Sequence, residues 1–454
     1  MRKSFLKNGE GARHPHRDRF VRVPGTFLLL MVLWLAPCVH AAEVTKADAF
    51  SKELSLAGLL KAAAQANPDI RAARLKWEAA RKKSQQALSL PDPMVGMDVM
   101  GEMSESRVGP EENRLMISQK IPFPAKIWKR WQVQREMAKA ARREYEAVRR
   151  DVLLDARKTH YQLYQTDGAL AVIHEIHELL TQMGAAARAR YAEGSAGQRD
   201  AAKAQAEVSL TLGRVFQLEQ KRGALHARLN ALLDRDPLLA FGPAGKPAKP
   251  VLKETLAELL TLAARQRQEI LKSENKIRQK KHEKTLAWMK NIPDLDAGFS
   301  YTWVGGGMTS DMEDGKDSWM FPLSVNVPLW QNRNIAAIQE ASKELEAARA
   351  QLSGMRNETF YEVRDAYLRC ETALKIAVLY ESGVLPQAEL ALNSDRAGYE
   401  AGRTDFLGLL DSERVYLDAK LGYLKIFTEA LKSRADLDRA IGKNGLEHEH
   451  EKSV

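Results

Sequence analysis

The sequence predicts a mainly α-helical, internally duplicated protein that also carries two pairs of β-strands. Duplication is indicated by YEAGRTDFLGLLDSER at Tyr399–Arg414, which has an earlier counterpart at Tyr191–Glu207, YAEGSAGQRDAAKAQAE. Tracts of about 70 residues rich in Ala, Glu, Lys, Leu and Arg are typical of long or coiled-coil helices. Alternating apolar residues before each tract predict strands of about ten residues, the length that crosses a bilayer.

The N-terminal segment 1–41 has the features of a secretory signal peptide. A basic stretch ends near Arg22, an apolar core covers 26–36, and Val39-His40-Ala41 fits the small-x-small cleavage rule. We therefore expect export and a mature chain that begins near Ala42.

Cysteine and charge exclude few functions. Cys38 lies in a faint lipoprotein-like pattern that Pro37 fits poorly, so lipidation is left open. Without Cys38, Cys370 has no disulfide partner. The net charge of +10 comes partly from the N-terminal segment, and the other basic residues alternate with acids. We therefore expect no nucleic-acid partner.

Two repeats are expected in the mature chain, at 42–234 and 252–442. A linker rich in Pro and Gly joins them at 235–251, and 443–454 reads as a disordered tail. Each repeat begins with a short amphipathic helix and a second helix, which Asn67-Pro68 separates in the first copy.

The expected strands are 94–103, 113–122, 295–304 and 318–328. Pro122 and Pro328 mark the breaks from strand to helix, because proline cannot donate to a sheet ladder. A soluble hairpin remains the alternative for either pair taken alone.

Long helices are expected at 125–193 and 332–401, and shorter return helices at 199–233 and 405–441. Gly194 and Gly402 would close the two helix hairpins, because glycine adopts the left-handed conformation at a helix end. Pro386 is expected to kink or interrupt the second long helix.

This order of elements resembles the TolC family of outer-membrane factors over nearly the whole mature chain. The matching motifs are NPDI at Asn67–Ile70, IPFP at Ile121–Pro124, RYAEG at Arg190–Gly194, NVPLW at Asn326–Trp330 and GYEAGRTDFLGLLDSE at Gly398–Glu413. The resemblance implies a homotrimer whose chains each give four strands to a twelve-stranded β-barrel in the bacterial outer membrane. A long α-helical tunnel would continue it into the periplasm.

The resemblance further implies a passive exit channel of a tripartite efflux system. Its partners would be a periplasmic adaptor (membrane fusion) protein, an inner-membrane pump of the RND type and outer-membrane lipid. Heavy-metal cations or drugs would be exported. Alternatives are a type I secretion channel and, in another class, a periplasmic adaptor or structural coiled-coil protein. If the strands span the membrane, partner chains are also expected on physical grounds, because a sheet with two apolar faces and open edges is not stable alone.

Five residues near the hairpins are candidates for a periplasmic entrance or gate: Asp200, Tyr399, Arg403, Asp405 and Asp411. The resemblance places Asp200, Tyr399 and Asp411 at family gate positions, whereas Gly408 replaces a further family acid. A ring of Asp411 side chains would favour cations. The alternative is that these acids stabilise helix starts and that Tyr399 packs. Gly194 and Gly402 would lie where the adaptor docks.

No enzyme activity, cofactor or metal site is expected. The chain has no nucleophile–base pair, phosphate loop or cofactor fingerprint. His174 and His177 are spaced i, i+3 and read as a solvated helix face, and His448 and His450 lie in the expected tail. Methionines at 94, 97, 100 and 103 would alternate between strand faces, so they cannot form one metal-binding stripe.

Overall fold

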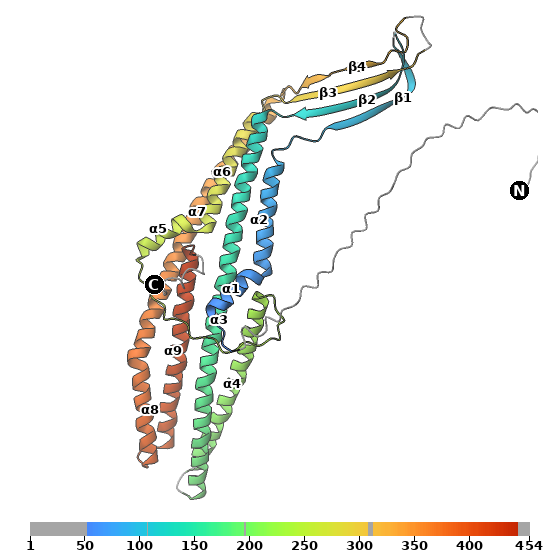
Figure 1. Ribbon diagram of the computed structural model, residues 1–454. Helices are drawn as coiled ribbons and strands as arrows, with labels where there is room; N and C mark the ends of the chain where they lie inside the picture. The colour runs from blue at the N-terminus through green and yellow to red at the C-terminus, as the bar shows by residue number, and fades with distance from the viewer. Residues whose placement is uncertain (1–51, 107, 195–196, 307–311, 444–454) are drawn as a thin grey trace, which may run out of the picture. The chain divides into compact units, whose positions relative to one another are not determined.

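The computed structural model describes residues 52–443 except 107, 195–196 and 307–311 (Figure 1). The expected signal peptide, Cys38, His448 and His450 lie outside the described residues. In the described part of the chain, two copies of one series of elements follow each other.

The first copy consists of α1 (Leu56–Ala66), α2 (Pro68–Gln86), β1 (Met94–Ser106), β2 (Gly109–Ile121), α3 (Pro124–Ala192) and α4 (Gln198–Leu232). Ser55 caps α1, and Asn67 caps α2 by accepting bonds from the amides of Asp69 and Ile70. Pro68 and Pro124 occupy the first turns of α2 and α3, where a missing amide costs nothing.

The second copy consists of α5 (Leu256–Gln266), α6 (Gln268–Met289), β3 (Leu295–Val304), β4 (Ser318–Met320), β5 (Leu323–Val325), α7 (Gln331–Leu379), α8 (Leu385–Glu400) and α9 (Phe406–Ala440). Thr255 and Glu258 form a capping box at α5. The two copies therefore begin with capped helices of the same length, 11 residues each.

Two elements of the second copy are interrupted where the sequence suggested continuity. The strand expected over 318–328 is divided into β4 and β5, because Pro322 has no amide to donate. The Pro322 carbonyl still accepts a bond from the Gly298 amide at 2.8 Å. The long helix expected over 332–401 contains a π-helical turn, Tyr380–Val384, directly before Pro386 in the first turn of α8.

The strands form one antiparallel sheet in the order β1-β2-β3-β4, and β5 also pairs with β3. The β2–β3 pair joins the two copies, since Ile121 lies opposite Leu295 and Glu111 opposite Val304. β1 and the β4–β5 side are open edges within this chain.

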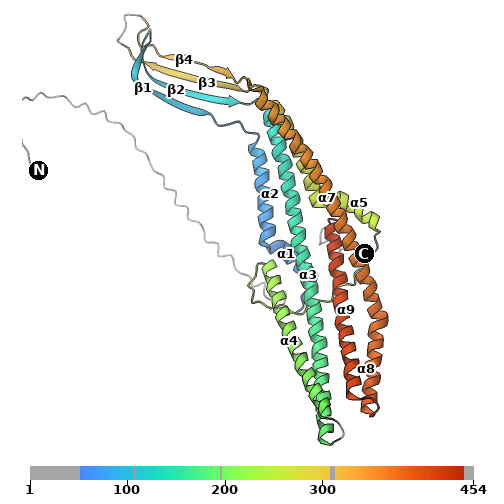
Figure 2. The same cartoon turned by 180° about the vertical axis from the view of Figure 1, so that it is seen from behind.

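The helices extend from the sheet in two tiers (Figure 1, Figure 2). α2 and α4 contact successive parts of α3, whereas α6 contacts α7, and α9 contacts α7 and α8. α3 also contacts α6 and α9, so it connects both copies along its length. The hairpin ends lie at the far end from the sheet.

Buried apolar residues gather in separate clusters along the helices. One cluster, the hairpin core, lies toward the hairpin ends and consists of Leu170, Ile173, Ile176, Leu180, Met183, Ala187, Ala204, Val215, Leu392, Phe406, Leu409, Leu410 and Leu417. Two others gather around α1 and α5, at the level where the short helices meet the long ones.

Candidate functional site

Both helix hairpins turn at a glycine in the left-handed conformation. Gly194 has φ +73° and Gly402 has φ +72°. After α8, the Gly402 amide donates to the Tyr399 carbonyl at 3.1 Å, and the Arg403 amide donates to the Gly398 carbonyl at 2.8 Å. This pair of bonds is a Schellman motif, which satisfies the last carbonyls of the helix.

The three candidate acids have different surroundings. Asp405 is the N-cap of α9 and accepts a bond from the Gly408 amide at 2.9 Å. Asp200 lies in the first turn of α4 with its side chain 25% exposed, 3.9 Å from Arg199. Asp411 is exposed and makes no hydrogen bond or ion pair to the described residues. Asp405 therefore has a clear structural role as a helix cap, whereas the exposed Asp411 has no partner among the described residues.

Tyr399 links the two hairpins. Its ring packs against the hairpin core and lies edge-on to Phe406, with centroids 5.9 Å apart. The guanidinium of Arg190, from α3, lies 4.5 Å from the centre of the Tyr399 ring. Such a cation–π contact is favourable. Both readings of Tyr399, as a packing residue and as a link between hairpins, thus fit its position.

The structure does not bring the five candidates into one cluster. No hydrogen bond or ion pair joins Asp200, Asp405 and Asp411 within the described chain, and Arg403 is exposed. A gate built from these residues would require side chains of other copies of the chain.

Glu413 is a notable residue that the sequence reading missed. It is only 2% exposed and follows Leu409 and Leu410 by one turn on α9. Burial, and next the charge of Glu207, raise its pKa to about 7, although Arg414 and Arg214 act in the opposite direction. An acid within an apolar helical stripe was the signal that could have identified it.

Ion pairs connect the two hairpins above their ends. Arg414 on α9 pairs with Glu207 on α4, and Lys420 on α9 lies 3.2 Å from Glu175 on α3. These contacts orient α9 against the first hairpin.

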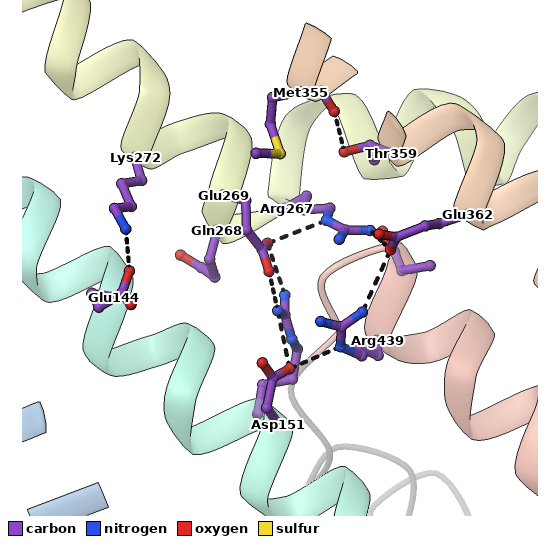
Figure 3. Close-up of polar contacts among 12 residues, drawn as sticks. Glu144, Asp151, Arg267, Gln268, Glu269, Lys272, Met355, Thr359, Glu362 and Arg439 are labelled. Atoms are coloured by element: carbon purple, nitrogen blue, oxygen red, sulfur yellow. Dashed lines mark hydrogen bonds and ion pairs between the residues drawn. The ribbon is translucent and has the colours of Figure 1, made fainter. Parts of the chain in front are cut away.

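A closed ring of six charges lies farther along the helices, where α9 ends beside the α5–α6 junction. Figure 3 shows most of this charged ring, which consists of Arg150, Asp151, Arg267, Glu269, Glu362 and Arg439. The nitrogen–oxygen distances are 2.5 Å for Arg150–Glu269, 3.2 Å for Arg267–Glu269, 2.7 Å for Arg267–Glu362, 3.4 Å for Arg439–Glu362, 2.9 Å for Arg439–Asp151 and 3.3 Å for Arg150–Asp151. The charged ring joins α3, α6, α7 and α9.

Part of the charged ring is buried, so its charges need partners of opposite sign. The side chains of Arg150 and Arg267 are each 3% exposed. Burial would raise the pKa of Glu269, but the hydrogen bond from Arg150 and the charges of Arg150 and Arg267 lower it to about 2. Every buried charge thus has partners of opposite sign, as buried ions require. Sequence alone could not identify this arrangement, because its members are far apart in the chain.

One face of the sheet is mainly apolar and the other is mainly polar, because directly paired residues share a face and the residues alternate along each strand. Apolar rows are Met97–Leu115–Tyr301–Trp319, Val95–Ile117–Phe299 and Ile121–Leu295–Val325. Polar rows are Asp98–Arg114–Thr302–Ser318 and Lys120–Asp296–Ser324. The expectation of two apolar faces is therefore wrong, since the strands alternate instead. Met94 and Met97 lie on opposite faces, as the strand period predicts.

The breaks after Pro122 and Pro328 lead into α3 and α7. At the first break, Asp294 accepts bonds from the Phe123 amide at 3.1 Å and from the Lys126 ammonium at 2.7 Å. Lys126 also donates to the Ile292 carbonyl at 2.6 Å. One buried lysine therefore fixes the β2–α3 junction of the first copy to the α6–β3 junction of the second.

Metal-binding groups and membrane-spanning helices are two features not found in the described part of the chain. No group of three or more His, Cys, Asp and Glu side chains there could hold a metal ion. None of the described helices is long and apolar enough to cross a membrane.

Comparison with known proteins gives a family match over most of the chain. The model of the family described as outer membrane efflux protein matches residues 59–234 and 259–443. These two segments correspond to the two copies seen in the structure.

One curated relative is the cobalt-zinc-cadmium resistance protein CzcC of Cupriavidus metallidurans. It is 23% identical over 154 residues, which cover 34% of this chain and 35% of CzcC. The match thus spans about a third of the length of that relative.

Solved structures show the same fold at low identity. The structure of CusC, 17% identical, has a TM-score of 0.74 over 87% of this chain and 93% of CusC. The open state of the Neisseria gonorrhoeae MtrE outer membrane channel, 20% identical, has a TM-score of 0.72 over 86% and 89% of the two chains. The chain therefore has the fold of these outer-membrane channels.

Proposed function

Since the chain belongs to the outer membrane efflux protein family, we propose that it is the outer-membrane duct of a tripartite efflux system. Solutes would pass through it passively, and an inner-membrane pump would supply the energy. Residues 1–41 would direct export and be removed.

The observation that carries this proposal is the two-faced sheet. Its apolar face suits lipid, and its polar face, with Asp98, Arg114, Lys120 and Asp296, suits a water-filled lumen. Open strand edges cannot lie in hydrocarbon, because each unpaired backbone group there costs several kcal/mol. Closure of the sheet with strands of other copies satisfies both edges. If β4 and β5 are counted as one interrupted strand, three copies would supply the twelve strands of a barrel.

The two open edges favour a head-to-tail arrangement of the copies. β1 of one chain would pair with the β4–β5 side of the next, and repetition of this heterologous contact closes a ring. Met94, Val95, Met97 and Val99 on β1 are all more than 60% exposed in the single chain. This exposure supports a partner or lipid on that strand.

At the other end, the hairpins that turn at Gly194 and Gly402 would dock to a periplasmic adaptor, which connects the duct to the pump. The exposed Asp411, repeated in every copy, would attract cations at the entrance. The resemblance to CzcC favours divalent metal cations as the exported solute. For the inner-membrane pump we propose the RND type, which is an implication of the resemblance to the TolC family.

Assembly in the membrane tests the duct proposal. Wild-type protein should be recovered from outer-membrane fractions as an oligomer that dissociates on heating, whereas recovery as a soluble periplasmic monomer would refute the proposal. Ile117→Arg places a charge on the apolar face, at a cost of about 2–4 kcal/mol at mid-membrane, and should prevent assembly. Ser118→Arg, one residue along on the polar face, is the matched control and should assemble normally.

Single-channel recording tests the entrance. Asp411→Ala should raise conductance or reduce cation selectivity, because it removes one carboxylate per copy from the pore mouth. Asp418→Ala, which removes an exposed acid two turns farther along α9, should leave both values unchanged. Unaltered conductance and selectivity in Asp411→Ala would refute a role for this acid.

A further inference from the structure

Glu413 interrupts an apolar stripe that packs α9 against its neighbours. Leu409 and Leu410 precede it by one turn and Leu417 follows it by one turn, and all three belong to the hairpin core. They are between 3% and 4% exposed, and Glu413 itself is 2% exposed. A carboxyl group thus occupies a position that suits a leucine.

The Glu413 carboxyl makes no hydrogen bond or ion pair with the described residues. The charged groups that act on it are Glu207 and Arg214 on α4 and Arg414 on its own helix. Arg414 is already paired with Glu207, so its positive charge is partly neutralised and does less to stabilise an ionised Glu413. From the other two neighbouring helices, Glu175 of α3 pairs with Lys420, and Asp395 of α8 accepts a bond from Ser412.

An ionised carboxylate in this position lacks compensation. Burial without a hydrogen-bond partner disfavours the charged form, and Glu207 adds a like charge. A bound metal ion is a poor alternative, because no group of three suitable ligands occurs among the described residues. A proton is therefore the natural neutralising partner.

We propose that a proton on Glu413 holds α9 against the α3–α4 hairpin, and that loss of this proton loosens the contact and favours opening of the hairpin end. The inference rests on the proposed duct, whose entrance lies at this end. In the packed state Glu413 is a neutral acid. On release of the proton to solvent, the carboxylate gains stability when α9 moves and exposes it to more water.

The direction of the pH effect follows from the raised pKa. The pKa of Glu413 is raised from 4.5 to about 7, so the packed state binds the proton more tightly than the open state does. The packing contribution is therefore fully present below about pH 4.5 and is lost as the pH rises through about 7. Alkaline conditions would favour the open hairpin end.

The test is hydrogen–deuterium exchange of residues 405–420 in the full-length oligomer between pH 5.5 and 8.5, corrected for the intrinsic exchange rate. In the wild type we expect the opening equilibrium to rise at least tenfold over this range. Glu413→Gln, which keeps the shape of the neutral acid, should stay at the low value throughout. Glu219→Gln removes an exposed acid from α4 and should follow the wild type.

A second variant checks the neighbouring charge. Glu207→Gln removes the like charge and releases Arg414, so the midpoint of the pH dependence should move to lower pH. Single-channel conductance recorded over the same range should rise with pH in the wild type and stay constant in Glu413→Gln. A pH profile of Glu413→Gln equal to that of the wild type would overturn the inference. If the wild-type protein showed no single-channel current, the proposed duct would be refuted. Hydrogen–deuterium exchange would still show whether the proton on Glu413 holds α9 in place.

Discussion

The return helices α4 and α9 occupy the same place in the two copies and have the same length, 35 residues each, but they are buried very differently. Sixteen residues of α9 are buried, against seven of α4. α9 contacts α7, α8 and α3, whereas the main contact of α4 is with α3. The same secondary structure therefore serves two roles, one inside the chain and one at its edge.

The exposed side of α4 is partly apolar. Leu210 is 60% exposed, Leu212 41% and Phe216 60%. Apolar residues left open on a helix that repeats a buried one indicate a surface for a further chain. Under the trimeric arrangement proposed above, α4 would meet another copy in the way that α9 meets α7 and α8.

The two helices also end differently. The carbonyl of Leu232, at the end of α4, accepts a bond from the Asn67 side chain at 3.0 Å. The carbonyl of Ala440, at the end of α9, accepts a bond from Arg267 of the charged ring at 3.2 Å. One copy thus uses a neutral amide where the other uses a buried ion network, and this difference can be measured.

The largest effect is expected at the charged ring. Arg267→Met removes a buried cation and leaves Glu269 and Glu362 with fewer partners, which should lower the free energy of unfolding by about 3–5 kcal/mol. Asn67→Ala, the matched change in the first copy, should cost about 1–3 kcal/mol. Urea unfolding followed by helical circular dichroism measures both. Equal losses of unfolding free energy in the two variants would mean that the ion pairs of Arg267 add nothing beyond its hydrogen bond to the Ala440 carbonyl.

The second effect concerns apolar packing. Leu417→Ala empties a site that is 4% exposed on α9 and should cost about 2–5 kcal/mol in the same assay. Leu210→Ala on α4 should change monomer stability by less than about 0.5 kcal/mol. It should nevertheless lower the recovery of oligomer, measured by electrophoresis without heating. Normal oligomer from Leu210→Ala would contradict the proposed role of the α4 surface.

A smaller effect is expected from two helix glycines at nearly matching positions. A Cβ added at Gly422 of α9 would lie 2.8 Å from the Tyr380 hydroxyl, so Gly422→Ala should lower stability by about 1–2 kcal/mol. At Gly213 of α4 nothing lies within 4 Å of the added atom, and Gly213→Ala should raise stability by about 0.5–1 kcal/mol. Thermal unfolding distinguishes the two signs, and destabilisation by both would show that α4 is covered as α9 is.

The smallest effect is expected for the ion pair between the two helices. The Arg414 side chain is 57% exposed, so its pairing with Glu207 should contribute less than about 1 kcal/mol and weaken with added salt. A double-mutant cycle with Glu207→Gln and Arg414→Gln measures the coupling. A coupling that is large and independent of salt would show that this pair is shielded from water in the assembly.

The local features of this chain could be derived from its sequence. Gly194 and Gly402 turn the hairpins, Asn67 caps α2, and proline stands at the start of α3. Such effects act over a few residues of backbone, so the local sequence is enough to derive them. Pro322 also acts over a few residues, but the alternating apolar pattern predicts one continuous strand over 318–328, whereas the structure divides it into β4 and β5. Duplication of such signals also indicated the family.

Only the tertiary structure decided which distant residues meet. The register of β2 with β3 gave the sheet one polar face, and the meeting of four helices closed the charged ring around Arg267. Packing of α9 on three helices buried Glu413, whereas the similar helix α4 stayed open. Sequence determines what a segment can form, but burial and charge pairing depend on what lies beside it, and neither quantity is encoded at one position.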